Sequence, residues 1–404
     1  MSNRNNDIVV IVIFLVYIFS VGILSIKNNI KLFKETKESV QEQYAYSNAN
    51  NLERMNLIKN SFENTFSNNL IGKYDYIDIY GLFQRILQKN VVEDVEDGKR
   101  VIRLKNGNLA FIYPEIYTDE FSEKIIAVSN YSKERGIYML YTDAPWRIEN
   151  KDDLPFYLKD NVNKTDQKFI KKLKENDVNV LELKKELDGN KNEWFFHTDH
   201  HWNIDTAFNA YKLIMKSIEK NTNIEIEDKY LSDYTIKVYD DVFLGTYGKR
   251  VGKYYGGVDD FSYITPNFET ELDVINNRDW NNEVSHLKGN FEKVFMYPEY
   301  IDNTKLERKM STYYTYTEGI KAEVKIKNLK ANNNKKVLIL TDSFGEPVFP
   351  FVSLNFQETR VIDVRRYRAI RLYTYIEKYD PDVILFIHTP TSLYDKSCYN
   401  FQLK

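Results

Sequence analysis

The sequence has very little cysteine and no concentrated positive charge. Cys398 is the single cysteine in 404 residues, so the chain cannot form an intrachain disulfide or build a thiolate metal site. We expect Cys398 to be a buried apolar residue rather than a nucleophile. The net charge is −3 and no block of Lys and Arg stands out. The composition therefore gives no reason to expect a nucleic-acid partner.

Recognised metal motifs are also missing. The zinc-peptidase motif H-E-x-x-H is absent, and so is the H-x-H-x-D-H spacing of metallo-β-lactamase-like hydrolases. We therefore predict no cofactor and no resident metal. The alternative is a metal held by His197, Asp199, His200 or His201, which are close in sequence and carry suitable ligand atoms.

The longest apolar run covers Ile8 to Ile26 and contains no charged residue. As a helix it would be about 28 Å long, close to the hydrocarbon thickness of a bilayer. A cleaved signal peptide is the alternative, but its apolar core is normally shorter. We predict an uncleaved, single-pass signal anchor over residues 1–27, with the remaining chain outside the cytoplasm. Three lysines follow the run closely, and this charge balance argues against that orientation.

Beyond the anchor, the pattern of apolar residues changes twice. Residues 28–73 are predicted to form a helical stalk or entry segment, because an apolar stripe within them recurs at spacings of three and four: Leu52, Met55, Ile58, Phe62 and Phe66. From residue 74 to 404, predicted helices alternate with short apolar strands, which indicates βαβ units and a parallel sheet. Between 221 and 334 short alternating runs and clustered glycines replace this pattern, and we predict a mostly β insertion there. The predicted strands are 137–142, 178–183, 336–341, 359–363 and 382–387, and the predicted helices are 120–135, 164–176, 205–219, one from about 346, and 369–379.

Polar residues follow the predicted strands at one edge of the sheet. In open α/β sheets, ligands bind outside the carboxyl ends of the strands. Asp143, Ser343, Arg365 and His388 all follow predicted strands, so we expect them to lie near one another. Ser343 also precedes a predicted helix, whose first N–H groups can hold an oxyanion. The alternative is that Asp342 and Ser343 only cap that helix.

Three of the five histidines lie within residues 197–201. A serine nucleophile needs a base, and the base needs an orienting group. Asp199 and His201 alternate along an expected extended stretch, so both can lie on one face, where the carboxylate would fix the imidazole tautomer. His200 would then point away and be structural. Trp202 either forms a wall of the pocket or packs in the core.

The residues Asp199-His200-His201-Trp202 resemble the signature of the DHHW protein family. With the later strand ending in Thr341-Asp342-Ser343-Phe344, they resemble the SGNH-hydrolase-like domain of the alginate O-acetylation proteins AlgX and AlgJ, over roughly residues 110–400. This resemblance implies an SGNH, flavodoxin-like three-layer α/β/α fold and acyl-ester chemistry. It assigns Ser343 as the nucleophile, His201 as the base and Asp199 as the orienting carboxylate.

The chain departs from that family at the nucleophile turn. Thr341 stands where the family has Gly, and the α/β-hydrolase elbow would need Gly there as well. The Gly and Asn blocks that complete the oxyanion hole of typical SGNH enzymes have no clear counterpart. Arg365 or backbone N–H groups would have to replace them.

Two function classes agree with this sequence. The first is a membrane-anchored, extracytoplasmic serine O-acetyltransferase or acetylesterase acting on a cell-surface or exported polysaccharide, with Asp143, Trp202, Arg365 and His388 contacting the substrate. The resemblance implies a membrane-bound O-acyltransferase as a partner. The second is a non-catalytic glycan-binding or scaffold protein of an envelope assembly, which would account for the 31 tyrosines and the large insertion.

Overall fold

A computed structural model gives the structure of the chain. It describes residues 2–45, 51–94, 98–278, 284–301, 310–319, 321–367 and 370–404. The chain divides into two compact units, Met1–Tyr80 and Gly81–Lys404. The predicted boundaries after residues 27 and 73 remain predictions.

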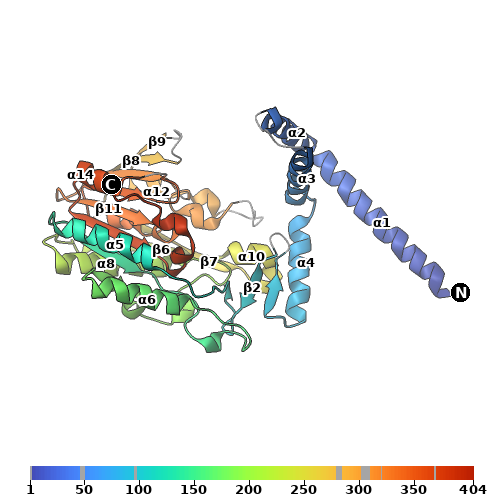
Figure 1. Ribbon diagram of the computed structural model, residues 1–404, viewed down its shortest axis with the longest axis horizontal. Coiled ribbons are helices and arrows are strands. Elements are labelled where there is room, and N and C mark those ends of the chain that lie inside the picture. Colours follow the sequence, from blue (N-terminus) through green and yellow to red (C-terminus); the bar gives the residue numbers. More distant parts are fainter. Residues whose placement is uncertain are drawn as a thin grey trace. The chain divides into compact units, whose positions relative to one another are not determined.

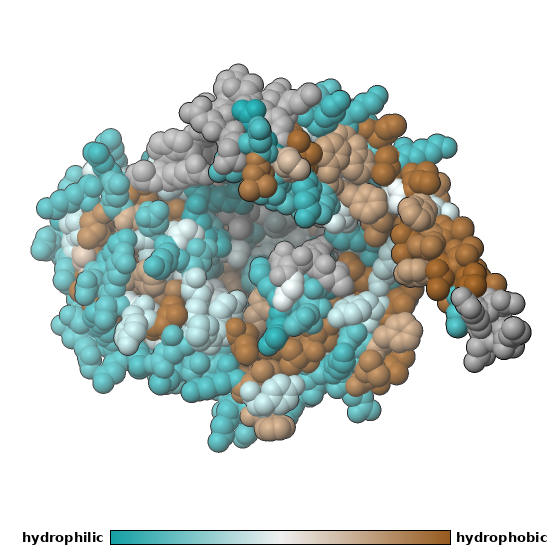
Figure 2. Space-filling model, turned by 45° about the vertical axis from the view of Figure 1, so that its right-hand side comes forward, coloured by the Kyte–Doolittle hydropathy of each residue, from teal (hydrophilic) through white to brown (hydrophobic). Residues whose placement is uncertain are grey.

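The first unit is helical. Its helices are α1 (Ser2–Asn28), α2 (Ile30–Ala45), α3 (Asn51–Asn68) and the beginning of α4 (Lys73–Ile86) (Figure 1). Within α1, Asp7–Asn28 is long and apolar enough to cross a membrane, with a mean hydropathy of 3.0. Figure 2 shows its apolar side chains as a continuous surface. A membrane anchor and a signal sequence share these properties.

Helices α2 and α3 pack against each other. The rings of Phe33 and Phe62 stack with centroids 6.1 Å apart, and the hydroxyls of Thr36 and Thr65 are 2.9 Å apart. The apolar stripe that predicts a helical stalk therefore lies partly between these two helices. Leu52, at the start of the stripe, is exposed.

The second unit is built on an eight-stranded mixed sheet with the order β5-β4-β13-β11-β12-β10-β8-β9. The first five strands run parallel to one another, which confirms the predicted parallel sheet. The strands of this parallel part are β4 (Tyr138–Asp143), β5 (Val180–Glu182), β11 (Lys336–Thr341), β12 (Glu358–Ile362) and β13 (Val383–His388).

Strands from the predicted insertion extend this sheet in antiparallel fashion. They are β8 (Leu272–Asn277), β9 (Val284–Gly289) and β10 (Glu323–Asn328). β10 pairs with β12 and β8, and β8 pairs with β9. The insertion is thus mostly β, and part of it belongs to the central sheet itself.

Helices cover both faces of the sheet, because alternate strand residues are apolar on both sides. Val337 and Ile339 of β11 belong to one buried cluster, and Leu338 and Leu340 belong to another. The first cluster includes residues of α8 (Ile204–Asn221), α12 (Phe291–Phe295) and α13 (Phe349–Ser353). The second includes residues of α5 (Asp119–Lys133), α6 (Val162–Glu175) and α14 (Leu372–Tyr379). The result is the predicted three-layer α/β/α architecture (Figure 1).

Smaller elements surround this sandwich. They are the sheet of β1 (Val91–Glu93), β2 (Arg100–Arg103) and β3 (Leu109–Ala110), the pair β6 (Tyr234–Phe243) and β7 (Asp259–Pro266), and the short helices α7 (Leu183–Glu186), α9 (Lys229–Ser232), α10 (Thr246–Val251) and α11 (Lys253–Gly256). Strands β2 and β3 pair as a hairpin around the Asn106-Gly107 turn, where Gly107 has a φ of +92°.

The pairing of the central strands brings the predicted polar residues to one edge. His388 at the end of β13 pairs with Asp143 at the end of β4. On its other side, β13 pairs Ile387 with Thr341, two residues before Ser343.

The predicted helix 369–379 corresponds to α14, although Ala369 lies outside the described residues. Cys398 is buried, at 3% exposed.

Candidate active site

The histidine residues lie on a closed loop immediately before α8. A β-bridge joins Phe195 and Trp202, and the N–H of Asn203 donates to the carbonyl of Trp194 over 2.9 Å. The side chain of Asn203 also caps α8 by accepting from the N–H of Thr206. The loop is therefore anchored at its base by backbone pairing and by the start of a long helix.

Three side chains form a continuous hydrogen-bonded chain at the sheet edge. Asp199 Oδ1 lies 2.6 Å from His201 Nδ1, and His201 Nε2 lies 2.8 Å from Ser343 Oγ. Asp199 and His201 are 1% and 7% exposed, whereas Ser343 is half-buried. The structure thus brings together residues 142 positions apart in the sequence, within the reach that a serine nucleophile and its base require.

The environment of Asp199 decides the direction of these hydrogen bonds. Burial would raise its pKa, but the neighbouring His200 and His201 and the hydrogen bonds from His201 and Thr246 lower the pKa well below the ordinary value. The group is therefore a carboxylate and can only accept. His201 must then donate from Nδ1, which leaves Nε2 free to accept the Ser343 hydroxyl proton.

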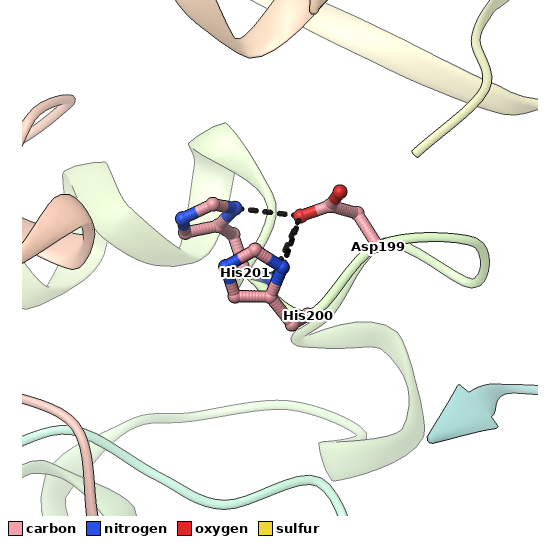
Figure 3. A group of neighbouring side chains, drawn as sticks. All are labelled: Asp199, His200 and His201. Atoms are coloured by element: carbon pink, nitrogen blue, oxygen red, sulfur yellow. Dashed lines mark hydrogen bonds and ion pairs between the residues drawn. The ribbon is translucent and has the colours of Figure 1, made fainter. Parts of the chain in front are cut away.

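The expected orientation of His200 is wrong. Its ring centroid lies 3.7 Å from that of His201, and its Nδ1 lies 3.4 Å from Asp199 Oδ1 (Figure 3). The reason is that residues 197–201 follow a series of bends instead of an extended strand, so alternation does not apply. Desolvation lowers the pKa of His200, although 37% of its side chain is exposed.

Two buried ionisable residues, Arg147 and Asp259, bond to the backbone of the histidine loop, and the sequence analysis identified neither of them. The Arg147 guanidinium donates to the carbonyls of Asp199 and Phe196. Asp259, at the start of β7, accepts from the N–H of His197 over 2.6 Å and from the N–H of Thr198 over 2.9 Å. Arg147 follows the strand end at Asp143 by four residues, which could have pointed to it. Asp259 has no comparable local signal, because it lies about 60 residues from the loop.

The serine turn shows how the chain accommodates Thr341. The Thr341 hydroxyl donates to the carbonyl of Ile387 over 2.9 Å. A Cβ at Gly345 would lie 2.0 Å from the same hydroxyl oxygen. Glycine at 345 thus supplies the space that the Thr341 side chain occupies. The predicted helix from about 346 is replaced by a 3-10 turn at Ser343–Gly345 and the short α13, because Pro347 and Pro350 lack the N–H that continuous helix pairing needs.

Capping and catalytic geometry coexist at this turn. The Asp342 carboxylate accepts from the N–H of Phe344 over 2.9 Å and from the N–H of Thr389 over 3.2 Å. Burial raises the pKa of Asp342 to about 6. Among the described residues, the N–H of Ser343 donates to no protein acceptor. That N–H is available for an oxyanion next to the Ser343 hydroxyl.

Three of the four predicted substrate contacts are buried in the fold. Asp143, Trp202 and His388 are at most 1% exposed, so a ligand in solvent does not reach them. Their contacts are with other parts of the fold: Asp143 lies 3.8 Å from Lys184, Trp202 donates to the carbonyl of Phe344 over 3.2 Å, and His388 packs edge-on to Tyr399. Burial lowers the pKa of His388 to about 3.

The sequence suggested that Arg365 contacts the substrate or holds the oxyanion, and the structure shows its guanidinium paired with Asp363. Its Nε donates to Asp363 Oδ1 over 2.9 Å, and its Nη2 pairs with Asp363 Oδ2 at 2.5 Å. This fork uses two of the five guanidinium N–H donors and leaves three outside it. The backbone N–H of Ser343 and the Arg365 side chain therefore both remain candidates for the oxyanion donor.

The metal alternative has a geometric counterpart. Asp199, His200 and His201 offer ligand atoms that all lie within 4.8 Å of one another (Figure 3). His197, in contrast, is exposed and lies 3.8 Å from Asp259. Both ring nitrogens of His201 already have partners in Asp199 and Ser343. A metal bound here would have to displace one of these hydrogen bonds.

Comparison with known proteins identifies similar folds. Residues 122–238 match the family model described as SGNH hydrolase-like domain, acetyltransferase AlgX. Bacillus cereus PatB1, solved with a sulfonyl adduct, is 22% identical with a TM-score of 0.58, covering 75% of this chain and 97% of PatB1. A DHHW family protein from Eubacterium siraeum is 18% identical with a TM-score of 0.56, covering 78% of this chain and 100% of its own. No curated protein matches the chain.

A more distant likeness involves the O-acetyltransferase domain of Pseudomonas putida AlgJ, which is 11% identical with a TM-score of 0.41 and covers 72% of this chain and 91% of its own. The family match and the likenesses to PatB1 and the DHHW family protein confirm the resemblance that the Asp-His-His-Trp and Asp-Ser motifs predict. The second unit of the chain has the SGNH hydrolase-like α/β fold, with its sheet extended by antiparallel strands.

Proposed function

We propose that the protein is a membrane-anchored, extracytoplasmic O-acetyltransferase or acetylesterase acting on a cell-surface or exported polysaccharide. The observation that carries this proposal is the chain of hydrogen bonds from Asp199 through His201 to Ser343. The match to a domain described as an acetyltransferase supports acetyl as the transferred group. The apolar helix α1 supports attachment to a membrane through residues 8–26.

The proposed first step acylates the serine. The Ser343 oxygen attacks the acetyl carbonyl carbon while its proton passes to His201 Nε2, and Asp199 stabilises the resulting imidazolium. The N–H of Ser343 donates to the oxyanion of the tetrahedral intermediate. Collapse of the intermediate breaks the bond to the leaving group, which takes the proton from His201, and leaves acetyl-Ser343.

The second step uses the same groups in reverse. His201 accepts a proton from a sugar hydroxyl, whose oxygen attacks the acetyl-serine carbonyl. Collapse restores Ser343 with the proton held by His201 and releases the acetylated sugar. Water in place of the sugar would give acetate, the esterase outcome. A membrane-bound O-acyltransferase that delivers acetyl groups across the bilayer is the partner this scheme would need.

The test is acetyl release from a chromogenic acetyl ester by the full chain in detergent. We expect Ser343→Ala to lower kcat/KM by about 10³-fold or more, because it removes the nucleophile. Ser232→Ala, at an exposed serine in the same unit, should keep the original rate. Equal rates for the original protein and Ser343→Ala would exclude this function.

A further inference from the structure

Tyr313 contacts both the predicted base and the predicted nucleophile. It lies on the 3-10 turn Thr312–Thr315, within the predicted insertion, and is 3% exposed. Its ring stacks on the His201 imidazole with centroids 4.0 Å apart and planes 13° apart. Its hydroxyl donates to the carbonyl oxygen of Ser343 over 3.1 Å. One side chain thus joins the two residues between which the proton would move.

The imidazole of His201 needs such support. Asp199 holds Nδ1 and Ser343 holds Nε2, but both hydrogen bonds lie at the ring edge and do not fix the tilt of the ring about that axis. The rings of His200 and Phe344 contact the imidazole at 38° and 47° to its plane, so neither gives it a parallel face. The broad torsion of an imidazole gives little intrinsic resistance to tilting. A parallel aromatic face limits this motion, and such stacking favours the aligned arrangement by roughly 2- to 10-fold. Tyr313 supplies that face.

Tyr313 is itself fixed by contacts outside the site. Its N–H donates to the Ser311 hydroxyl over 3.3 Å. The N–H of Thr317 donates to the carbonyl of Phe295 in α12 over 2.7 Å. These contacts hold the segment on both sides of Tyr313, so the tyrosine does not depend on His201 for its own position.

The buried Lys321 bonds to the backbone that follows Tyr313 in the sequence. Thr317, Glu318 and Gly319 have positive φ values of 65°, 57° and 79°. Their three carbonyls accept from Lys321 Nζ over 3.0, 3.0 and 3.2 Å. Backbone in this region is costly for non-glycine residues, and it persists where surrounding contacts determine it, often at functional sites.

We propose that Tyr313 is a positioning residue of the acyl-transfer site: its ring holds the His201 imidazole in plane with Ser343, and its hydroxyl fixes the serine turn. This inference rests on the proposed function, and it gives the predicted insertion a role in the chemistry. Of the two Tyr313 contacts, ring stacking on His201 contributes more to positioning. The Tyr313 hydroxyl bonds to a backbone turn that the Asp342 side chain already caps.

The test measures how fast Ser343 reacts with phenylmethanesulfonyl fluoride in the full chain, with labelling located by mass spectrometry and Ser343→Ala as the blank. We expect Tyr313→Phe, which keeps the ring, to stay within about 3-fold of the original maximal rate. Tyr313→Met and Tyr313→Leu, which lose it, should lower that rate by about 10-fold. We expect the half-saturating concentration to stay unchanged, because Tyr313 is buried at 3% exposed.

The control is Tyr314→Met at the next position, where the ring packs edge-on to Tyr300. It should leave the rate within about 3-fold, and thermal melts should show that each variant is folded. Original rates in a folded non-aromatic variant, or a loss in Tyr313→Phe as large as in Tyr313→Met, would overturn the proposal. If neither non-aromatic variant folds, the Phe variant decides alone: a loss of 10-fold or more overturns the ring assignment, and retention supports it.

This measurement separates the two proposals, because labelling requires neither an acetyl donor nor a glycan. A chain that labels at Ser343 but releases no acetyl would refute the proposed function while still testing Tyr313. A chain whose Ser343 does not label at all would overturn both.

Discussion

Glu346, three residues after Ser343, is a buried acid with no hydrogen-bond partner for either carboxyl oxygen among the described residues. It is 4% exposed. Burial first, and the nearby Asp363 second, raise the pKa of Glu346 to about 8. At neutral pH the group is therefore mainly protonated, which removes the need for a buried counter-ion. An ionised carboxylate, Asp199, thus bonds to the predicted base, whereas the acid three residues after the predicted nucleophile is neutral.

This assignment predicts a pH-dependent stability. The folded state holds the Glu346 proton up to about pH 8, whereas the unfolded state loses it near 4.5, so the folded state binds more protons between these values. The free energy of unfolding should fall as pH rises through this window, by on the order of a few kcal/mol in total. Glu346→Gln cannot ionise and should remove that fall.

Urea unfolding at pH 4.5 and pH 8 measures the effect. Relative to the original protein, Glu346→Gln should be more stable at pH 8 than at pH 4.5, while Glu225→Gln, at an exposed position, should show no such difference. An identical pH dependence in the original protein and Glu346→Gln would show that Glu346 ionises normally in the folded state.

At the scale of elements, the α10 start and the histidine loop touch at a point where no side chain fits. A Cβ at Gly245 would lie 2.3 Å from the Cβ of Asp199 and 2.6 Å from the carbonyl of Thr198. The φ of Gly245 is −73°, so the requirement concerns space and not backbone conformation. The close approach lets the N–H of Thr246 reach Asp199 Oδ2 at 2.6 Å.

Gly245→Ala should therefore displace Asp199 and with it His201. We expect kcat/KM for acetyl ester cleavage to fall by about 100-fold, because misplacement of a catalytic group by about 1 Å has effects of this size. Thr246→Ala keeps the backbone N–H and should retain the rate within about 3-fold. Full activity in a folded Gly245→Ala would mean that the loop tolerates the displacement, contrary to the expectation.

The elements that the sequence predicted well are those that local pattern determines. Strand 336–341 is a continuous apolar run, and the structure places β11 over the same residues. The packing of residues 221–334 was not predictable in the same way, because the pairing of β10 with β12 depends on contacts between distant segments. The roles of Arg147 and Tyr313 also depend on distant contacts, with partners 52 and 30 residues away. The orientation of His200 was predicted from the alternation of an extended strand, and this failed because the loop bends.

At the scale of the whole molecule, the proposed membrane attachment rests on α1. Helix α1 exposes Ile, Val, Leu and Phe side chains along most of its length, and a soluble helix would be expected to bury one face. Anchoring would keep the proposed active unit near polymers that emerge from the cell, where a membrane-bound acetyl donor would also lie. The lysines that follow the helix favour the opposite orientation, so sidedness requires a direct measurement.

The anchor prediction can be tested by charge insertion. Each central apolar residue favours membrane insertion by about 0.3–0.6 kcal/mol and each central Arg opposes it by about 2.5–3.5 kcal/mol. The run of Ile, Val, Leu and Phe therefore sums to several kcal/mol, and two arginines offset it. We expect the original chain to stay in the membrane fraction after carbonate washing with residues 8–26 intact by mass spectrometry. Ile11→Arg with Leu15→Arg should release it, whereas the same change at Glu35 and Glu38, beyond the span, should not.

The orientation of the chain is tested with protease. Because protease added outside intact cells would digest only an exported unit, cleavage of residues 81–404 in such cells would establish the extracytoplasmic orientation. Full protection of these residues would establish the opposite orientation.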